Sequence, residues 1–113
     1  MADCLFCKIA KKELESEIVA ESDGAVAFND INPAAPTHVL VIPKRHIPSV
    51  AELSESDGEL LAELFEMIKK VAADAGIAES YRVVSNIGGG AGQSVFHLHF
   101  HVLGGRTMSW PPG

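Results

Sequence analysis

The sequence predicts an α+β fold in which one long helix backs a mainly antiparallel sheet. Three observations lead to this class. Short apolar, β-branched segments occupy the first part of the chain, one long segment with apolar residues at helical spacing follows, and further strand-like segments come after it. The short turn between the first two strand-like segments is typical of an antiparallel hairpin. At 113 residues the chain is expected to form a single domain, residues 1–113.

The first half of the chain is expected to contain one short helix and three strands. Residues 6–11 are expected to form the helix. Residues 18–21 and 25–29 predict two short strands, with residues 22–24 (SDG) as the turn between them. After a loop with two prolines, residues 38–43 (HVLVIP) are β-branched and apolar, which predicts a buried strand.

The second half begins with the long helix. Ser54 is expected to open it, with Asp57 three positions on in a variant of the capping box. Its buried face is predicted by apolar residues at helical spacing, namely Leu60, Leu61, Leu64, Phe65, Ile68 and Val71. Residues 81–87 and 95–103 predict two further strands, and the glycine-rich segment 88–93 predicts a mobile loop between them.

Charge and composition argue against several classes of function. The net charge of −6 argues against binding a nucleic-acid polymer, because neutralising its backbone needs clustered Lys and Arg. No segment approaches the length of a membrane span, and residues 1–12 lack the apolar stretch of a signal peptide. The cysteines Cys4 and Cys7 fit a reducing compartment, as free thiols or metal ligands. We therefore expect a cytoplasmic protein, and its small core favours dimerisation.

Three histidines alternate with apolar residues in the last predicted strand, namely His97, His99 and His101. Because side chains of a strand alternate between its two faces, the three imidazoles are predicted to share one face. The intervening apolar residues then face the core. Packing does not explain three aligned imidazoles, so we expect them to face a cleft or a metal ion.

Two interpretations of this face remain open. In the first, the histidines bind a catalytic metal. In the second, one neutral imidazole is a nucleophile, which suits phosphoryl or nucleotidyl transfer near pH 7. The surroundings favour the second, because Gln93, Ser94 and a glycine-rich loop precede the histidines and offer donors to a small anion. His38, which begins another strand, is a candidate to brace one of the three.

These histidines also carry a resemblance to a known family. Residues 97–103 (HLHFHVL) resemble the signature of the histidine triad (HIT) superfamily. The similarity extends to residues 28–33 (FNDINP), 36–38 (PTH) and 42–46 (IPKRH). Residues 92–95 (GQSV) and 110–113 (WPPG) resemble the histidine triad nucleotide-binding (HINT) branch.

The resemblance implies a fold and an activity. The fold is HIT-like: a five-stranded, mainly antiparallel sheet with one long helix and a short N-terminal helix, and with the sheets joined across a two-fold dimer. The activity is that of a purine nucleoside phosphoramidase, which hydrolyses the P–N bond of nucleoside 5′-monophosphate–amine conjugates. The reaction passes through a nucleotidyl-histidine intermediate and requires no cofactor.

The resemblance also implies the roles of individual residues. His99 matches the nucleophile, His101 a phosphate contact, His38 an orienting residue, and Ser94 a donor to the leaving group. His97 is either an orienting neighbour or a metal ligand. The remaining matches contact the substrate: Gln93 and Asn86 on the phosphate side, Asp30 at the ribose hydroxyls, Phe6, Leu5, Ile9, Phe28, Ile31 and Leu40 around the base, and Trp110, which reaches toward the partner's site.

Cys4 and Cys7 have the spacing of half a zinc site. Within the resemblance, His46 and His97 complete a structural zinc site in some relatives. The alternative is that both thiols are free and partly buried.

Three other functions remain as alternatives to the phosphoramidase. One is a dinucleoside polyphosphate hydrolase, which the WPPG ending disfavours. Another is a purine-nucleotide-binding adaptor protein with little turnover. The last is a metalloenzyme that uses the three histidines as ligands.

Overall fold

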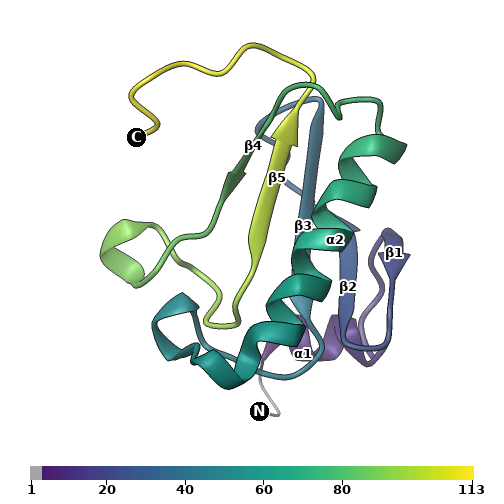
Figure 1. Cartoon of the computed structure of the whole chain (residues 1–113), viewed down its shortest axis with the longest axis vertical. Helices are drawn as coiled ribbons and strands as arrows, with labels where there is room; N and C mark the ends of the chain where they lie inside the picture. Colours follow the sequence, from purple (N-terminus) through teal and green to yellow (C-terminus); the bar gives the residue numbers. More distant parts are fainter. Residues whose placement is uncertain (1–3) are drawn as a thin grey trace.

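Five antiparallel strands form one sheet in the order β1-β2-β3-β5-β4, with the long helix α2 across it (Figure 1). This computed structural model describes residues 4–113. The predicted α+β fold is therefore confirmed, including the five-stranded sheet, the single long helix and the short N-terminal helix. The predicted domain also includes residues 1–3, which lie outside the described residues.

The first half of the chain agrees closely with the predicted elements. Helix α1 spans Leu5–Ala10, and the Cys4 Sγ atom caps it by accepting a hydrogen bond from the Cys7 N–H at 3.3 Å. Strands β1 (Ile18–Glu21) and β2 (Ala25–Asn29) form the predicted hairpin. Strand β3 (Thr37–Pro43) is buried along most of its length and lies at the centre of the sheet.

The long helix begins later than predicted. Ser54 caps a 3₁₀ turn, η2 (Glu55–Asp57), and α2 follows as Gly58–Asp74. The capping interaction is present, because the Asp57 carboxylate accepts a hydrogen bond from the Ser54 N–H at 2.9 Å. Another 3₁₀ turn, η1 (Val50–Glu52), precedes it.

The last two strands are shorter than predicted. Strand β4 is Tyr81–Val84, not 81–87, and β5 is Phe100–Gly104, not 95–103. The physical reason lies in β3, which pairs with β5 only as far as Val41 opposite Phe100. Ile42 and Pro43 continue β3 beside β2, but the chain before Phe100 does not pair with them, and the Leu98 N–H instead donates to the Ile47 carbonyl oxygen beyond β3. The glycine-rich loop between β4 and β5 contains a 3₁₀ turn, η3 (Gly89–Ala91).

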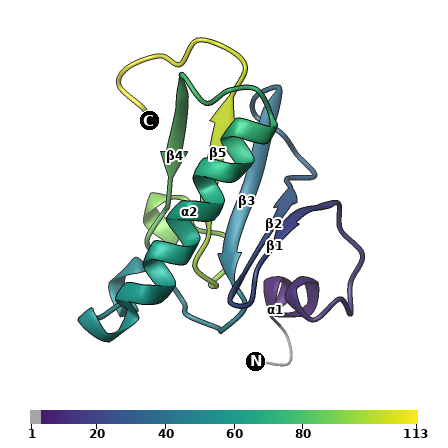
Figure 2. The ribbon, with the colours of Figure 1, turned by 45° about the vertical axis from the view of Figure 1, so that its right-hand side comes forward.

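The two faces of the sheet bury different clusters. On one face, Val39 and Val41 of β3 pack with α2 and with Leu98, Phe100 and Val102. On the other face, Leu40 and Ile42 pack with residues of α1 and β2. Figure 2 shows α2 running along the sheet, with α1 apart from it beside β1 and β2. The face that carries α1 is the one that carries the site described next.

Within residues 4–113, no helix combines the length and the apolar character needed to span a membrane.

Candidate functional site

A cavity of about 410 Å³ opens on the α1 face of the sheet. Its apolar wall consists of Leu5, Phe6, Ile9, Leu14, Phe28, Ile31, Leu40 and Val95. Its polar lining consists of Glu15, Ser16, Asn29, Asp30, Ser94, His99 and His101. A cavity that combines an apolar wall with polar groups able to orient a ligand is the usual form of a small-molecule site.

The imidazole of His99 has a defined hydrogen-bonding state. Its Nδ1 atom lies 2.7 Å from the backbone carbonyl oxygen of His97. A carbonyl oxygen only accepts, so Nδ1 carries the proton and donates it. Nε2 therefore keeps its lone pair. The ring is 6% exposed and packs edge-on against Phe6, with centroids 5.0 Å apart. This arrangement orients the ring and, in its neutral form, leaves the Nε2 lone pair available to an electrophile in the cavity.

A second set of contacts fixes His101 through His38. The Ala34 N–H donates to His38 Nδ1 at 2.9 Å, so the His38 proton is on Nε2. His38 Nε2, which carries this proton, lies 2.9 Å from His101 Nδ1 and 3.3 Å from an oxygen of the Asp30 carboxylate. With its Nδ1 as acceptor, a neutral His101 carries its own proton on Nε2 and is a donor there.

Burial keeps His101 neutral. Burial is the main cause that lowers the pKa of His101 to about 4; the neighbouring His99 and His38 contribute to this shift, and Asp30 opposes it. The groups Asp30, His38 and His101 lie close enough together to suggest a metal site. However, the Ala34 N–H occupies the only lone pair of neutral His38, so that ring has none left for a metal ion.

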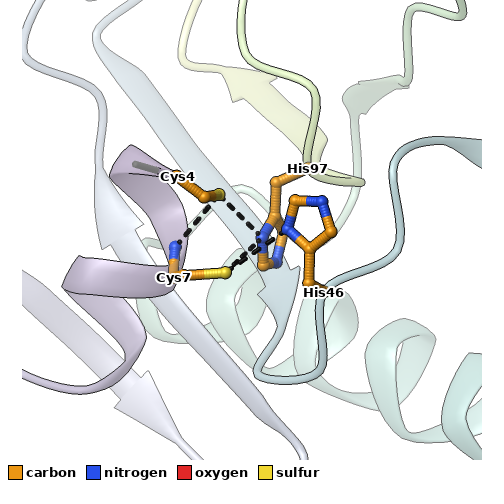
Figure 3. A group of neighbouring side chains, drawn as sticks. All are labelled: Cys4, Cys7, His46 and His97. Atoms are coloured by element: carbon orange, nitrogen blue, oxygen red, sulfur yellow. Dashed lines mark hydrogen bonds between the residues drawn. The ribbon is translucent and has the colours of Figure 1, made fainter. Parts of the chain in front are cut away.

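The third histidine of the predicted face belongs to a separate cluster (Figure 3). Potential ligand atoms of Cys4, Cys7, His46 and His97 all lie within 4.8 Å of one another. His97 Nδ1 is 3.3 Å from Cys4 Sγ and 3.5 Å from Cys7 Sγ, and His46 Nδ1 is 3.3 Å from Cys7 Sγ. In a tetrahedral zinc site the bond lengths place S and N ligands about 3.5 Å apart. The cluster therefore fits zinc in donor type, number and spacing.

His97 has the tautomer that a metal ligand needs. Its Nε2 atom donates to the Pro43 carbonyl oxygen at 2.8 Å, so Nδ1 keeps its lone pair and faces the thiols. The ring is fully buried, and burial lowers its pKa. Burial also raises the pKa of the Cys7 thiol, and the neighbouring Cys4 adds to this effect. A bound cation would oppose that shift and favour the thiolate.

The structure separates the predicted histidine face into two parts. Because β5 begins at Phe100, only His101 lies in the regular strand, and His97 and His99 precede it. The alternation of faces nevertheless continues through this segment, because Leu98 and Phe100 pack in the α2 cluster. His99 and His101 line the cavity, whereas His97 does not.

Other predicted site residues have different positions. Ser94 and Asp30 line the cavity, together with all six apolar residues expected around a base. The Gln93 amide is turned away from the cavity: it accepts from the Gly88 N–H at 2.8 Å and donates to the carbonyls of Pro48 and Val95. Asn86 is not among the lining residues, and Trp110 is 81% exposed in the C-terminal tail.

Several lining residues were missed by the sequence analysis. Leu14, Glu15 and Ser16 come from the loop between α1 and β1, and Asn29 ends β2. Asn29 precedes Asp30, so its position at the end of a strand was a usable signal. The loop carries no comparable pattern.

Comparisons with known proteins are consistent across sequence and structure. A family model described as scavenger mRNA decapping enzyme C-terminal binding matches residues 3–110. The chain is 50% identical over 111 residues to an uncharacterised HIT-like protein of Synechocystis, covering 98% of this chain and 97% of that protein. It is 48% identical over 111 residues to the 14 kDa zinc-binding protein of Zea mays, covering 96% and 87%.

Solved structures agree with these matches. The chain is similar to a HIT family hydrolase from Legionella pneumophila, with a TM-score of 0.96, 49% identity, and coverage of 98% of this chain and 100% of that one. It is also similar to a HIT family hydrolase from Clostridium thermocellum, with a TM-score of 0.93, 52% identity and 96% coverage of each chain.

Proposed function

Because this chain belongs to the HIT-like protein family, we propose that it is a purine nucleoside phosphoramidase. It hydrolyses the P–N bond that joins a nucleoside 5′-monophosphate to an amine. Similarity to two solved HIT family hydrolases supports hydrolysis at the general level. The observation that carries the specific proposal is the free Nε2 lone pair of His99 in a cavity with an apolar wall.

The proposed orientation of the substrate in the cavity follows from the residues that line it. The purine lies against the apolar wall, and the α-phosphate lies at the end that holds His99 and His101. Asp30 accepts hydrogen bonds from the ribose hydroxyls, for which a carboxylate with two oxygens is suited. The Nε2–H group of neutral His101 donates a hydrogen bond to a phosphate oxygen.

The first chemical step forms the intermediate. The His99 Nε2 lone pair attacks phosphorus, the P–N bond to the amine breaks, and the Ser94 hydroxyl, which lines the cavity, donates to the leaving nitrogen. The positive charge that develops on the His99 ring is stabilised by the His97 carbonyl, which already accepts its Nδ1 proton. In the second step water attacks phosphorus, the bond from phosphorus to His99 Nε2 breaks and restores neutral His99, and the nucleoside monophosphate is released; the proton that water loses replaces the proton that the amine took from the Ser94 hydroxyl in the first step. No step requires a cofactor.

We further propose that the Cys4, Cys7, His46 and His97 cluster holds a structural zinc ion. The observed donor spacing and the named zinc-binding relative support this site. The ion would join α1 to the segment that follows β3 and to the segment that precedes β5.

We also propose that the protein forms a two-fold dimer, as in the HINT branch. The β4 edges of the two sheets meet in this dimer, and Trp110 of each copy reaches the partner's site. The edge position of β4 and the exposure of Trp110 support this assembly.

The test of the phosphoramidase is the variant His99→Asn. We expect turnover of an adenosine phosphoramidate to fall by about 10³-fold or more, because the nucleophile is removed. The variant should keep its circular dichroism spectrum and still bind AMP. Undiminished turnover would contradict the proposed mechanism.

Substrate comparison separates the phosphoramidase from the two nucleotide-directed alternatives. A higher rate on diadenosine polyphosphate than on the phosphoramidate would favour a dinucleoside polyphosphate hydrolase. AMP binding without turnover of either substrate would favour an adaptor protein.

A further inference from the structure

We infer that metal binding and nucleotide binding are energetically coupled through α1 and His97, so that the metal ion assembles the nucleotide cavity. This inference rests on the proposed function, because it assumes that the cavity accepts a purine nucleotide. It assigns to Cys4, Cys7 and His46, which do not line the cavity, a positioning role in nucleotide binding.

Helix α1 belongs to both sites at once. Cys4 at its N-cap and Cys7 at its third residue supply the two thiols of the cluster. Leu5, Phe6 and Ile9 of the same helix line the cavity. In a helix of six residues, any shift that changes the thiols must also change the cavity wall.

The attachment of α1 to the rest of the protein depends on few interactions. A helix this short is not stable alone in water and needs tertiary contacts. Its buried contacts include Phe6 and Ile9 in the smaller apolar cluster, the ring of Phe6 against two histidines, and Cys7 against two imidazoles. Two metal–thiolate bonds would add the strongest constraint on its position.

His97 connects the cluster directly to His99. Its ring is in the cluster, with Nδ1 toward the thiols and Nε2 held by Pro43. Its backbone carbonyl accepts the Nδ1 proton of His99. A metal ion that fixes the ring of His97 therefore also fixes the group that orients His99.

Phe6 completes the connection. Its ring packs edge-on against both His97, with centroids 6.1 Å apart, and His99, with centroids 5.0 Å apart. Phe6 is also part of the cavity wall. The cluster is thus joined to the cavity in three ways: by the backbone of α1, by the hydrogen bond from His99 to the His97 carbonyl, and by the packing of the Phe6 ring.

Coupling of this kind is reciprocal. If the metal ion raises the affinity for a nucleotide by some factor, the nucleotide raises the affinity for the metal by the same factor. We expect a factor of about 10, within the range of roughly 5- to 150-fold that is typical of coupled sites.

The experiment measures both affinities on the full-length protein under reducing conditions. AMP is titrated calorimetrically into zinc-loaded protein and into protein freed of metal by chelation and dialysis. Zinc affinity is measured with a chromophoric competitor, with and without saturating AMP. Circular dichroism verifies that the metal-free protein is folded at the temperature used. We expect weaker AMP binding without zinc and the same factor in the reciprocal measurement.

Variants locate the coupling. Cys7→Ser removes one thiolate, and AMP should then bind with a single affinity whether or not zinc is added. Should this variant not fold, His46→Gln, which alters the cluster from the side opposite α1, serves the same purpose. Lys11→Ala is the matched control, because Lys11 is an exposed residue at the end of α1 outside both sites, and its coupling should equal that of the wild type.

Each outcome has a distinct meaning. Equal AMP affinity with and without zinc overturns the coupling and leaves the phosphoramidase proposal intact. Failure of the protein to bind zinc also overturns the coupling. Failure to bind AMP in either state overturns the proposed function together with the coupling.

Discussion

At the scale of single residues, hydrogen bonds decide which imidazole nitrogen can react. His99, His97 and His38 each have one ring nitrogen committed to a backbone group. These contacts fix two tautomers in three settings: His99 keeps its lone pair on Nε2 toward the cavity, His97 keeps its lone pair on Nδ1 toward the thiols, and His38 carries its proton on Nε2 toward His101. Identical side chains thereby acquire different chemistry.

The sequence was sufficient to single out these histidines but not to separate them. Alternation with apolar residues correctly predicted that Leu98, Phe100 and Val102 would pack in the core. It could not assign His97 to the thiol cluster, because that depends on where His46 and α1 lie in space. Nor could it predict that the Gln93 amide would be used up by backbone groups of its own loop and of Pro48.

The lowered pKa of His101 predicts a pH dependence of stability. In the folded protein its pKa is about 4, whereas the unfolded value is 6.5. Between these values the unfolded chain binds a proton that the folded protein does not, so His101 lowers the free energy of unfolding as the pH falls from 6.5 to about 4. Above pH 6.5 both states are neutral at this position and the effect is absent.

The variant His101→Gln tests this contribution. Its free energy of unfolding, measured by urea denaturation of metal-free protein, should depend less steeply on pH between 6.5 and 4 than that of the wild type. The groups around the ring, His38, His99 and Asp30, are the same in both proteins. Parallel curves in this interval would contradict a buried, neutral His101.

At the scale of elements, strand lengths depend on partners more than on composition. The predicted strands 81–87 and 95–103 extend beyond the observed β4 and β5, by residues 85–87 and 95–99 respectively. The Leu98 N–H donates to the Ile47 carbonyl oxygen and does not continue the pairing with β3, so β5 begins at Phe100, and residues 86–87, which follow β4, have no strand of the described residues opposite them. The early strands were predicted well because the hairpin of β1 and β2 is local in sequence.

The packing of α2 on the sheet includes a polar contact between Glu63 and the turn that joins β1 and β2, which we call the Glu63 clamp. This contact gives a stability prediction. The Glu63 carboxylate of α2 accepts hydrogen bonds from the Ser22 hydroxyl and from the Gly24 N–H, the latter at 2.7 Å. These donors lie in the turn between β1 and β2, and the bonds lower the pKa of Glu63. Glu63→Ala should reduce the free energy of unfolding by about 2 kcal/mol, because hydrogen bonds to a charged group are lost.

Glu66, in the same helix, is the matched control for Glu63. It is exposed and forms an i,i+3 ion pair with Lys69, with the charged atoms 3.5 Å apart. Glu66→Ala should change stability by less than about 0.5 kcal/mol. Chemical denaturation of the two variants compares them directly, and equal losses would show that the Glu63 clamp has no special role.

At the scale of the whole molecule, the β4 edge of the sheet bears on assembly. Strands β1 and β4 are the two edge strands, and both carry an exposed valine. Near β4 the chain also exposes Ile87, Phe96 and Trp110. Exposed apolar side chains beside an open strand edge are typical of a surface that pairs with another copy.

The proposed dimer therefore predicts different results for the same substitution at the two edges. Val83 lies in β4 and is 37% exposed, and Val19 lies in β1 and is 45% exposed. In a two-fold interface along β4, Val83→Asp places a carboxylate close to its own copy, where like charges repel. Analytical ultracentrifugation should show a wild-type dimer, a Val83→Asp monomer, and a Val19→Asp protein that remains dimeric. Dissociation by Val19→Asp alone would move the interface to β1, and a monomeric wild type would remove the dimer from the proposal.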